Sequence, residues 1–187
     1  MVRFVQEPAR GIPVKDEVDI LVVGGGPSGI MAARAAAGKG LKVMLIESRG
    51  YVGGNLTIGL PILGFLGRKG NQVVEGLPQM LIDRLRAKGK ASEHKPCKNH
   101  VSLTIIDSEE VKDVALGMLE EVGVKILFYV FCSDVIKEGN EVKAVKRFLR
   151  KPSLTVPVTQ TWLTVQAWNA TRATKTAECS LLHSCSA

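Results

Sequence analysis

A short apolar run that is followed at once by closely spaced glycines constrains this chain more than any other feature. Residues 19–23 read Asp-Ile-Leu-Val-Val, which predicts a strand buried on both faces of a sheet. Residues 28–38 form an alanine-rich block with high helix propensity, and residues 41–46 are apolar again. A strand, a glycine turn, a helix and a second strand predict a βαβ unit whose two strands are parallel.

The glycines of the turn are spaced as Gly24-x-Gly26-x-x-Gly29. Gly24 permits the tight turn, Gly26 lets the backbone approach a diphosphate, and Gly29 allows close packing of helix on strand. The first N–H groups of a helix have no partner within the helix and favour negative charge. The turn, including Pro27 and Ser28, is therefore a candidate site for the phosphates of a dinucleotide.

Glu47 lies at the carboxyl end of the second strand, near the offset at which an acid accepts hydrogen bonds from an adenosine ribose. A carboxylate there disfavours a 2′-phosphate, so FAD or NAD is expected rather than NADP. A glycine turn between a strand and a helix can also be only a turn. The strand, the helix, the small Ala33 and Glu47 together favour dinucleotide binding.

The rest of the chain continues the alternation of strands and helices, which predicts an α/β fold. The fold class expected is a Rossmann-type domain with a parallel βαβ core and a small β-hairpin. The further elements expected are a loop over 50–70, a helix over 77–88 ended by Gly89, a strand over 103–106, a helix capped by Asp107 and ended by Gly123, a strand over 124–131, and a hairpin of 134–136 with 141–145.

Length and composition limit the organisation of the protein. The 187 residues, 45% hydrophobic and 23% charged, suit one globular domain or most of one. We find no secretory leader and no apolar run near the ~20 residues that span a bilayer, so we expect no membrane association. Four cysteines without a close pair indicate a cytoplasmic protein, and the motif His94-x-x-Cys97-x-x-His100 lacks a fourth metal ligand, so no metal is expected.

Positive charge is concentrated near the carboxyl end. Residues 1–145 hold 19 basic and 17 acidic side chains, whereas residues 146–187 hold 6 and 1, which together give the net charge of +7. No aromatic residues alternate with this charge in strand positions, as base stacking would require. We therefore expect no nucleic-acid partner, and the oligomeric state is not indicated.

The glycine motif within residues 22–33, together with Leu-Ile-Glu at 45–47, resembles the amino-terminal signature of bacterial FAD-dependent oxidoreductases with a Rossmann domain of the glutathione-reductase type. Residues 53–57, Gly-Gly-Asn-Leu-Thr, are similar to the second glycine contact of that family, where the backbone passes the FAD diphosphate. The segment around residue 131 would lie against the adenine. The cofactor-binding residues expected are Gly24, Gly26, Pro27, Ser28, Gly29, Glu47, Ser48, Arg49, Gly53, Gly54, Asn55 and Phe131.

The resemblance implies an enzyme that uses FAD to transfer hydride or electrons to or from an unknown small-molecule substrate, with NAD(H) as a candidate electron partner. No catalytic acid or base can be named from it. Two alternatives stay open, an NAD-binding module without flavin and an inactive fragment. Asp107, Glu109 and Glu110 could be paired catalytic carboxylates, although their place before a helix favours capping.

The resemblance is expected to cover residues 18–145, which we take as an incomplete FAD-binding domain. An arm over 1–17 precedes it, and a tail over 146–187, out of frame or disordered, follows it. Residues 154–163 can be encoded by codons that, read one nucleotide earlier, give Ile-Asp-Cys-Thr-Gly-Asp-Ala-Asp-Leu-Ala. That peptide resembles the carboxyl-terminal Thr-Gly-Asp signature of the family. We therefore expect the reading frame to change between residues 142 and 149, and a divergent tail is the alternative.

The sequence of the gene tests this expectation. The codons for residues 154–163, read one nucleotide earlier, should spell the Thr-Gly-Asp peptide, and an uninterrupted family-like reading should follow. Codons that do not spell it would leave the tail as a genuine, divergent end of the chain.

Overall fold

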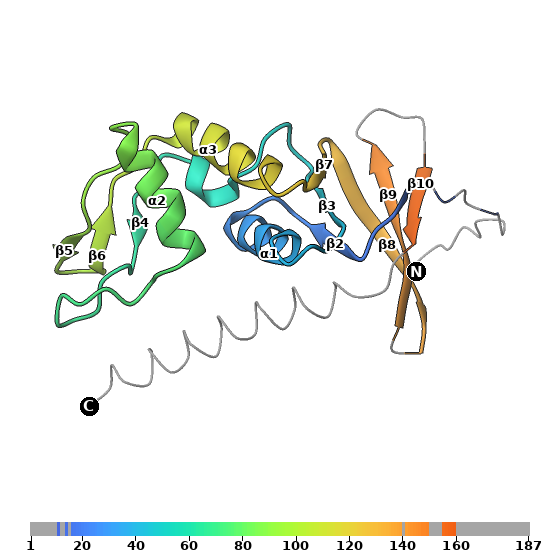
Figure 1. Ribbon diagram of the computed structural model, residues 1–187, viewed down its shortest axis with the longest axis horizontal. Helices are drawn as coiled ribbons and strands as arrows, with labels where there is room; N and C mark the ends of the chain where they lie inside the picture. Colours follow the sequence, from blue (N-terminus) through green and yellow to red (C-terminus); the bar gives the residue numbers. More distant parts are fainter. Residues whose placement is uncertain (1–10, 12–13, 15, 140, 150–154, 160–187) are drawn as a thin grey trace, which may run out of the picture.

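The computed structural model describes residues 11, 14, 16–139, 141–149 and 155–159 of the chain. Figure 1 shows three sheets spread along the longest axis of the molecule, with the helices beside and between them. The elements in chain order are β1 (Asp16–Glu17), β2 (Ile20–Val23), α1 (Pro27–Ala37), β3 (Val43–Ile46), the 3₁₀ helix η1 (Gly54–Thr57), β4 (Ile62–Leu63), α2 (Leu77–Ala87), β5 (Lys95–Cys97), β6 (Val101–Thr104), α3 (Ser108–Glu120), β7 (Lys125–Leu127), β8 (Val130–Glu138), β9 (Glu141–Leu149) and β10 (Thr155–Thr159).

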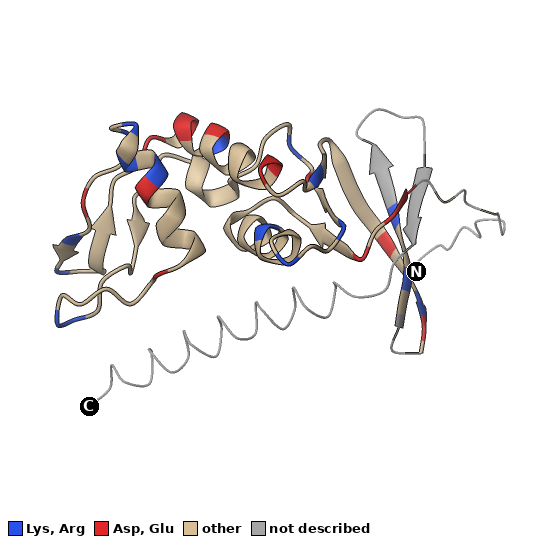
Figure 2. Cartoon of the chain, in the orientation of Figure 1, with Lys and Arg blue, Asp and Glu red and all other residues tan. Residues whose placement is uncertain are grey.

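The middle sheet has the order β2-β3-β7, and both neighbouring pairs are parallel. The expected βαβ unit is therefore confirmed. Neither β2 nor β3 carries a charged residue (Figure 2), and all four residues of β3 are buried. The prediction that the first strand is buried on both faces is wrong at its carboxyl end, because the side chain of Val23 is 47% exposed. In the described part of the chain β2 has a strand neighbour on one side only.

Helix α1 lies against this sheet through Ile30, Ala33 and Ala37, which are buried. The small side chain of Ala33 keeps the helix close to the strands. Proline is the first residue of the helix, where its missing N–H costs nothing and its fixed φ suits the helix start. Gly38 caps the carboxyl end of the helix.

Helix α3 begins as expected. The carboxylate of Asp107 accepts hydrogen bonds from the backbone N–H groups of Glu109 at 3.0 Å and Glu110 at 3.2 Å. The side chain of Lys90 and these two N–H groups hold the pKa of Asp107 below its usual range. Gly123, with a φ of 73°, follows the carboxyl end of the helix. The capping interpretation of this acidic segment is thus supported by its contacts.

Strand pairing corrects several predictions made from local patterns. The loop expected over 50–70 contains η1 and the short strand β4, and the polar stretch before His100 contains β5. Both short strands pair antiparallel with β6, which begins at Val101 instead of residue 103. Both short strands depend on pairing with β6, and the residues of β4 and β5 do not by themselves indicate this pairing.

The strand expected over 124–131 is two strands in two different sheets. Tyr129 has a φ of 58°, in the left-handed region, so the extended backbone is interrupted between β7 and β8. The hairpin that follows is confirmed but is longer than expected, because β8 and β9 pair from Val130 with Leu149 to Glu138 with Glu141. Residue 140, in its turn, lies outside the described residues.

The third sheet brings the two ends of the described chain together, in the order β1-β10-β9-β8. Strand β1 belongs to the expected arm over 1–17 and pairs parallel with β10, which belongs to the expected tail over 146–187. Most residues of both segments lie outside the described residues. Among the described residues, no helix has the length and apolar character needed to cross a bilayer.

Arg34 of α1 ties the helices to one another from a largely buried position. Its guanidinium donates to the carbonyl of Met118 in the last turn of α3 and to the sulfur of Met80 in α2 at 3.6 Å. Its side chain is 12% exposed, and Glu121 lies 3.6 Å away. The last carbonyls of a helix have no partner within the helix and carry partial negative charge, so a buried cation is well placed there.

Replacing Arg34 by Met should lower the free energy of unfolding by about 1–3 kcal/mol, because the Met118 carbonyl then loses a charged hydrogen-bond donor. Urea unfolding followed by circular dichroism measures this. Lys39→Met, at an exposed position just beyond the same helix, is the matched control and should change stability by less than about 0.5 kcal/mol. Equal stability of the two variants would remove the role given to Arg34.

Candidate functional site

The glycine turn between β2 and α1 is shaped by close backbone contacts. Gly24 has a φ of 98°, which L side chains rarely adopt, and its N–H donates to the carbonyl of Ile46 at 2.8 Å. A Cβ on Gly29 would lie 1.9 Å from the carbonyl oxygen of Gly24. Both glycines are therefore required by the turn itself, which agrees with the roles predicted for them.

Gly26 differs from its neighbours because a Cβ there would meet no atom within 4 Å. It is the N-cap of α1 and has an ordinary extended φ of −75°, and no side chain caps the helix. Within the described part of the chain, the N–H groups of Gly26, Ser28 and Gly29 donate to no protein acceptor. Open space in front of unpaired amides at a helix N-terminus is the arrangement that binds phosphate groups.

The carboxylate of Glu47 is buried directly beneath this turn. Its Oε2 accepts the N–H of Gly25 at 2.6 Å, and its Oε1 accepts the N–H of Arg49 at 2.8 Å and the hydroxyl of Ser48 at 3.0 Å. Two carboxylate oxygens have about four acceptor positions, so Oε2 can still accept a ligand hydroxyl. The predicted residues Glu47, Ser48 and Arg49 thus lie together with the glycine turn.

Gly25 is a site residue that the sequence analysis missed. A Cβ there would lie 2.9 Å from Cγ1 of Val52 and 3.1 Å from Oε2 of Glu47, so only glycine admits the carboxylate at this distance. The signal was present as an unbroken Gly-Gly-Gly run at 24–26. The motif assigns its spacing glycines and leaves the middle one unassigned.

The second glycine segment lies against the first, as the resemblance implies. The N–H of Gly53 donates to the carbonyl of Gly25 at 2.7 Å. A Cβ on Gly54 would lie 2.9 Å from Cα of Gly26, and both Gly53 and Gly54 have positive φ. Asn55, in η1, is exposed, and its side chain has no partner among the described residues. The glycine turn, the Glu47 segment and the second glycine segment therefore lie next to one another.

The segment at the start of β8 is hydrogen-bonded to the chain at Glu47 and Arg49. The N–H of Val130 donates to the carbonyl of Glu47 at 2.9 Å, and the N–H of Tyr129 donates to the carbonyl of Arg49 at 3.2 Å. Phe131, expected beside the adenine, is 51% exposed. Tyr129, which the sequence analysis did not single out, is 55% exposed, and its hydroxyl would lie 2.2 Å from a Cβ on Gly50.

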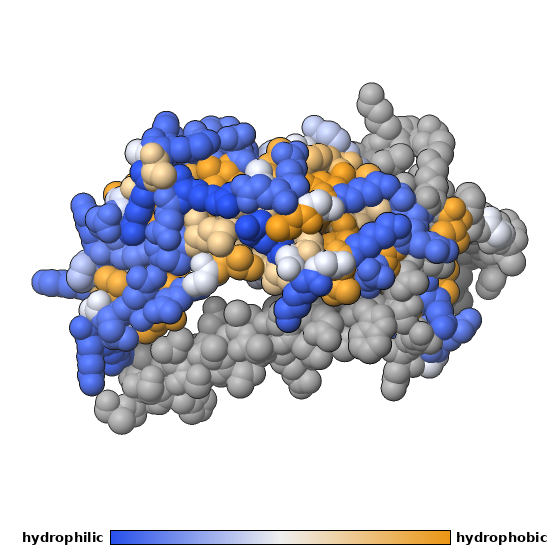
Figure 3. Space-filling view, in the orientation of Figure 1, coloured by the Kyte–Doolittle hydropathy of each residue, from blue (hydrophilic) through white to orange (hydrophobic). Residues whose placement is uncertain are grey.

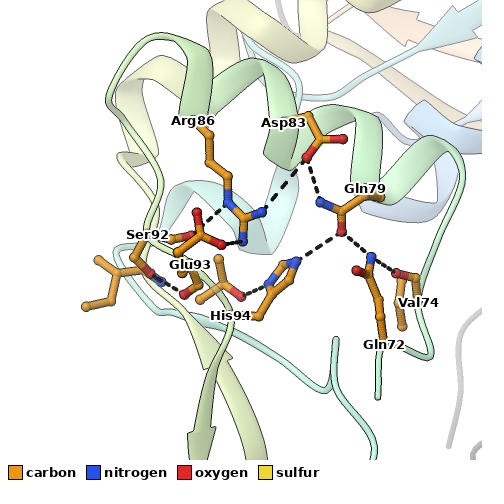
Figure 4. A network of polar contacts seen from close by, with 10 residues as sticks. Gln72, Val74, Gln79, Asp83, Arg86, Ser92, Glu93 and His94 are labelled. Carbon is orange, nitrogen blue, oxygen red and sulfur yellow. Dashed lines mark hydrogen bonds and ion pairs between the residues drawn. The ribbon is translucent and has the colours of Figure 1, made fainter. Parts of the chain in front are cut away.

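The residues of the possible metal motif have other surroundings. His94 stacks on Phe65 with ring centroids 4.5 Å apart, and its ring nitrogens contact the Thr104 hydroxyl at 2.6 Å and Gln79 Oε1 at 3.0 Å. Figure 4 shows His94 and Gln72 converging on the side chain of Gln79. Burial, aided by Arg86, lowers the pKa of His94. Among the described residues, no three His, Cys, Asp or Glu side chains are grouped to hold a metal ion.

The thiol of Cys132 is half-buried on β8, and burial raises its pKa. A raised pKa keeps the thiol protonated near neutral pH, and the protonated form is a poor nucleophile. Cys97 is half-buried on β5. Neither cysteine lies among the residues that surround the glycine turn.

The arrangement can bind an anion and a diol, and it offers backbone amides for the anion and a carboxylate for the diol. Glu47 is the one carboxylic acid among the described residues of the site, and its oxygens are engaged by backbone N–H groups and by the Ser48 hydroxyl. The site itself is therefore suited to holding a dinucleotide, and it carries no evident acid–base group of its own.

Two adjacent glycines should respond in opposite ways to the same substitution. Gly25→Ala should lower the free energy of unfolding by about 1–3 kcal/mol, because the new methyl group must displace Val52 or Glu47. Gly26→Ala should leave it within about 0.5 kcal/mol, because its methyl group enters open space. Chemical unfolding of both variants measures this, and an equally stable Gly25→Ala protein would contradict the packing described.

Comparison with known proteins places the chain in a family. Residues 19–158 match the family described as FAD dependent oxidoreductase. The segment where a change of frame is expected, residues 142–149, lies inside this match. A thiamine thiazole synthase of Methanococcus vannielii is 33% identical over 130 residues, which cover 69% of this chain and 45% of that protein.

Two further likenesses agree with this. A cinnamate reductase of Clostridium sporogenes is 58% identical over 55 residues, 29% of this chain and 8% of that protein. This chain thus spans less than half the length of either curated relative. The myxobacterial chondrochloren halogenase CndH shares the fold with a TM-score of 0.58 at 19% identity, over 80% of this chain and 37% of that one. The chain belongs to the family of FAD-dependent oxidoreductases.

Proposed function

We propose that this chain binds FAD at the glycine turn and forms part of an enzyme that transfers hydride or electrons to or from a small molecule. The observation that carries the proposal is the open space at Gly26, where unpaired amides begin helix α1 directly above the buried Glu47 carboxylate. The family match supports FAD as the dinucleotide.

Each part of the site has a role in the proposal. The amides of Gly26, Ser28 and Gly29 would donate to the diphosphate, and the helix dipole would favour its charge. Oε2 of Glu47 would accept hydrogen bonds from the adenosine ribose and would repel a 2′-phosphate. Gly53 and Gly54 would let the backbone approach the diphosphate from the second side. When bound, FAD supplies the ring that accepts and releases electrons.

The finer assignments complete the proposal. Pro27 starts the helix at the diphosphate, and Ser48, Arg49, Asn55 and Phe131 would border the adenosine and ribityl parts. NAD(H) is proposed as the electron partner and the bacterial cytoplasm as the location. The FAD-binding unit is proposed to span 18–145, and the family match extends the related segment to residue 158.

Titration of the purified chain with FAD, followed by flavin fluorescence, tests the proposal. Gly26→Val should weaken binding at least about tenfold, which is about 1.4 kcal/mol, because two methyl groups fill the diphosphate space. Glu47→Gln should weaken binding less and should lower the preference against a 2′-phosphate. Gly117→Ala, remote on α3, is the control and should bind as the wild type does.

Thermal unfolding of each variant separates lost binding from lost folding. Failure of a folded wild-type chain to bind FAD would contradict the proposal. Saturable binding of NAD in place of FAD would favour the NAD-binding alternative instead. Full FAD affinity in a folded Gly26→Val protein would place the cofactor elsewhere.

A further inference from the structure

An apolar cavity of about 340 Å³ opens beside the glycine turn and is separate from the backbone amides that face the proposed diphosphate. It lies between the amino-terminal half of α1, the 3₁₀ helix η1, strand β4 and helix α2. Its walls are formed by Pro27, Ser28, Met31, Ala32, Leu56, Ile62, Phe65, Pro78, Leu81 and Ile82.

The walls of this cavity select against charge. Ser28 is the only one of the ten wall residues with a polar side-chain group, and none of the ten carries a charge. An unpaired charge placed against such walls would be strongly unfavourable, and an unpaired amide or hydroxyl would be unfavourable too, because neither finds a polar partner there. The favourable contribution to binding is the apolar surface that is removed from water. The chemistry therefore favours an uncharged hydrocarbon or aromatic group.

The volume of the cavity limits the size of the group. An apolar cavity of ~150 Å³ accommodates benzene, and ligand cavities in proteins begin near ~300 Å³. A volume of about 340 Å³ thus has room for one bicyclic aromatic group or a short branched alkyl chain. A whole dinucleotide does not fit within it.

One wall of the cavity is held rigidly from behind. The ring of Phe65 is buried and stacks on His94 with an angle of 14° between the ring planes. His94 is fixed in turn by the buried hydroxyl of Thr104 and by Gln79 (Figure 4). Because polar contacts on both ring nitrogens orient the imidazole, the Phe65 ring has a fixed partner. A preorganised aromatic surface costs little conformational entropy when a ligand binds.

Exposed hydrophobic residues lie close in the chain to two wall residues of the cavity. Ile58 and Leu60 follow Leu56, and Leu63 follows Ile62, and all three are exposed although they are large and hydrophobic. Figure 3 shows hydrophobic patches within a largely hydrophilic surface on one face of the molecule. The segment that carries Leu56 and Ile62 therefore has apolar surface outside the cavity as well.

The position of the cavity relates it to the proposed cofactor. Pro27 and Ser28 line the cavity and also begin the helix whose amides face the diphosphate space. Gly54, which lies against Gly26, is followed two residues later by Leu56 of the cavity wall. A group bound in the cavity would therefore be next to the dinucleotide and on the other side of the first turn of α1.

We propose that this cavity binds the uncharged apolar group, aromatic or branched hydrocarbon, of the small-molecule substrate. The role as a substrate site rests on the proposed FAD-dependent function, whereas binding itself requires only the cavity. The class of substrate that follows is an organic molecule with one compact apolar end, which enters beside Phe65.

The neutral fluorescent probe N-phenyl-1-naphthylamine tests the proposal with the full chain, because its emission rises in an apolar site. The wild type should bind it saturably with one site per chain. Ala32→Phe should weaken binding at least about tenfold, because the new ring occupies the cavity. Ala35→Phe introduces the same ring on the exposed side of the same helix and should leave the affinity unchanged.

The outcomes separate this proposal from the proposed function. Gly26→Val should weaken FAD binding at least about tenfold and keep probe binding, and saturating FAD should leave the probe in place. Displacement of the probe by FAD would show that the cavity belongs to the cofactor and would overturn the proposal. Non-saturable binding, or equal weakening in both phenylalanine variants with unchanged melting temperatures, would overturn it too, because an uncovered apolar surface would then explain the signal.

Discussion

The hydrogen bond between Oε2 of Glu47 and the N–H of Gly25 is the contact on which the site depends. It joins the end of β3 to the turn after β2 at 2.6 Å, and the carbonyl of the same glycine accepts the N–H of Gly53 at 2.7 Å. The backbone N–H of Gly25 thus binds the buried Glu47 carboxylate, and the backbone carbonyl of Gly25 binds the second glycine segment. A buried carboxylate without such donors would be costly, so the turn and the acid stabilise each other.

This contact explains why the site is made of backbone rather than of side chains. Gly24 and Gly29 are fixed by their own contacts, and Gly25 is fixed by Glu47, which leaves Gly26 as the glycine whose missing side chain serves a ligand. The amides at the start of α1 are then held by the helix and cannot rearrange. Recognition through such amides depends on geometry, and the side chains nearby are free to form another surface. The apolar cavity beside Pro27 is that surface.

The parts of the fold set by local physics could be predicted from the sequence. The apolar strands, the alanine-rich helix and the cap at Asp107 follow from patterns within a few residues, and the structure contains all of them. The break at Tyr129 was missed because an apolar run of this composition indicates one strand, whereas a residue in the left-handed region ends it. Strand β5 was missed because its residues, Lys-Pro-Cys, carry no strand pattern, although its partner β6 follows closely in the chain. Strand β4 was missed because its partner β6 lies far away in the sequence. Gly25 was missed for the same reason, since the atoms that exclude a side chain belong to Glu47 and Val52.

The His94 side chain packs against the ring of Phe65, although histidine often serves as a metal ligand or an acid–base group. The sequence offers His94 in a motif that lacks a fourth metal ligand, and in the structure both ring nitrogens are engaged by neutral groups and the ring face lies on Phe65. A lowered pKa keeps the imidazole neutral near neutral pH, so its contact with the aromatic ring adds no charge beside the cavity. Burial is the largest cause of the lowered pKa of His94, ahead of the nearby Arg86. The network around β6 and α2 therefore keeps one wall of the cavity both rigid and apolar, while the middle sheet holds the glycine turn. The two halves of the proposed site are thus built by different sheets and meet at the first turn of α1.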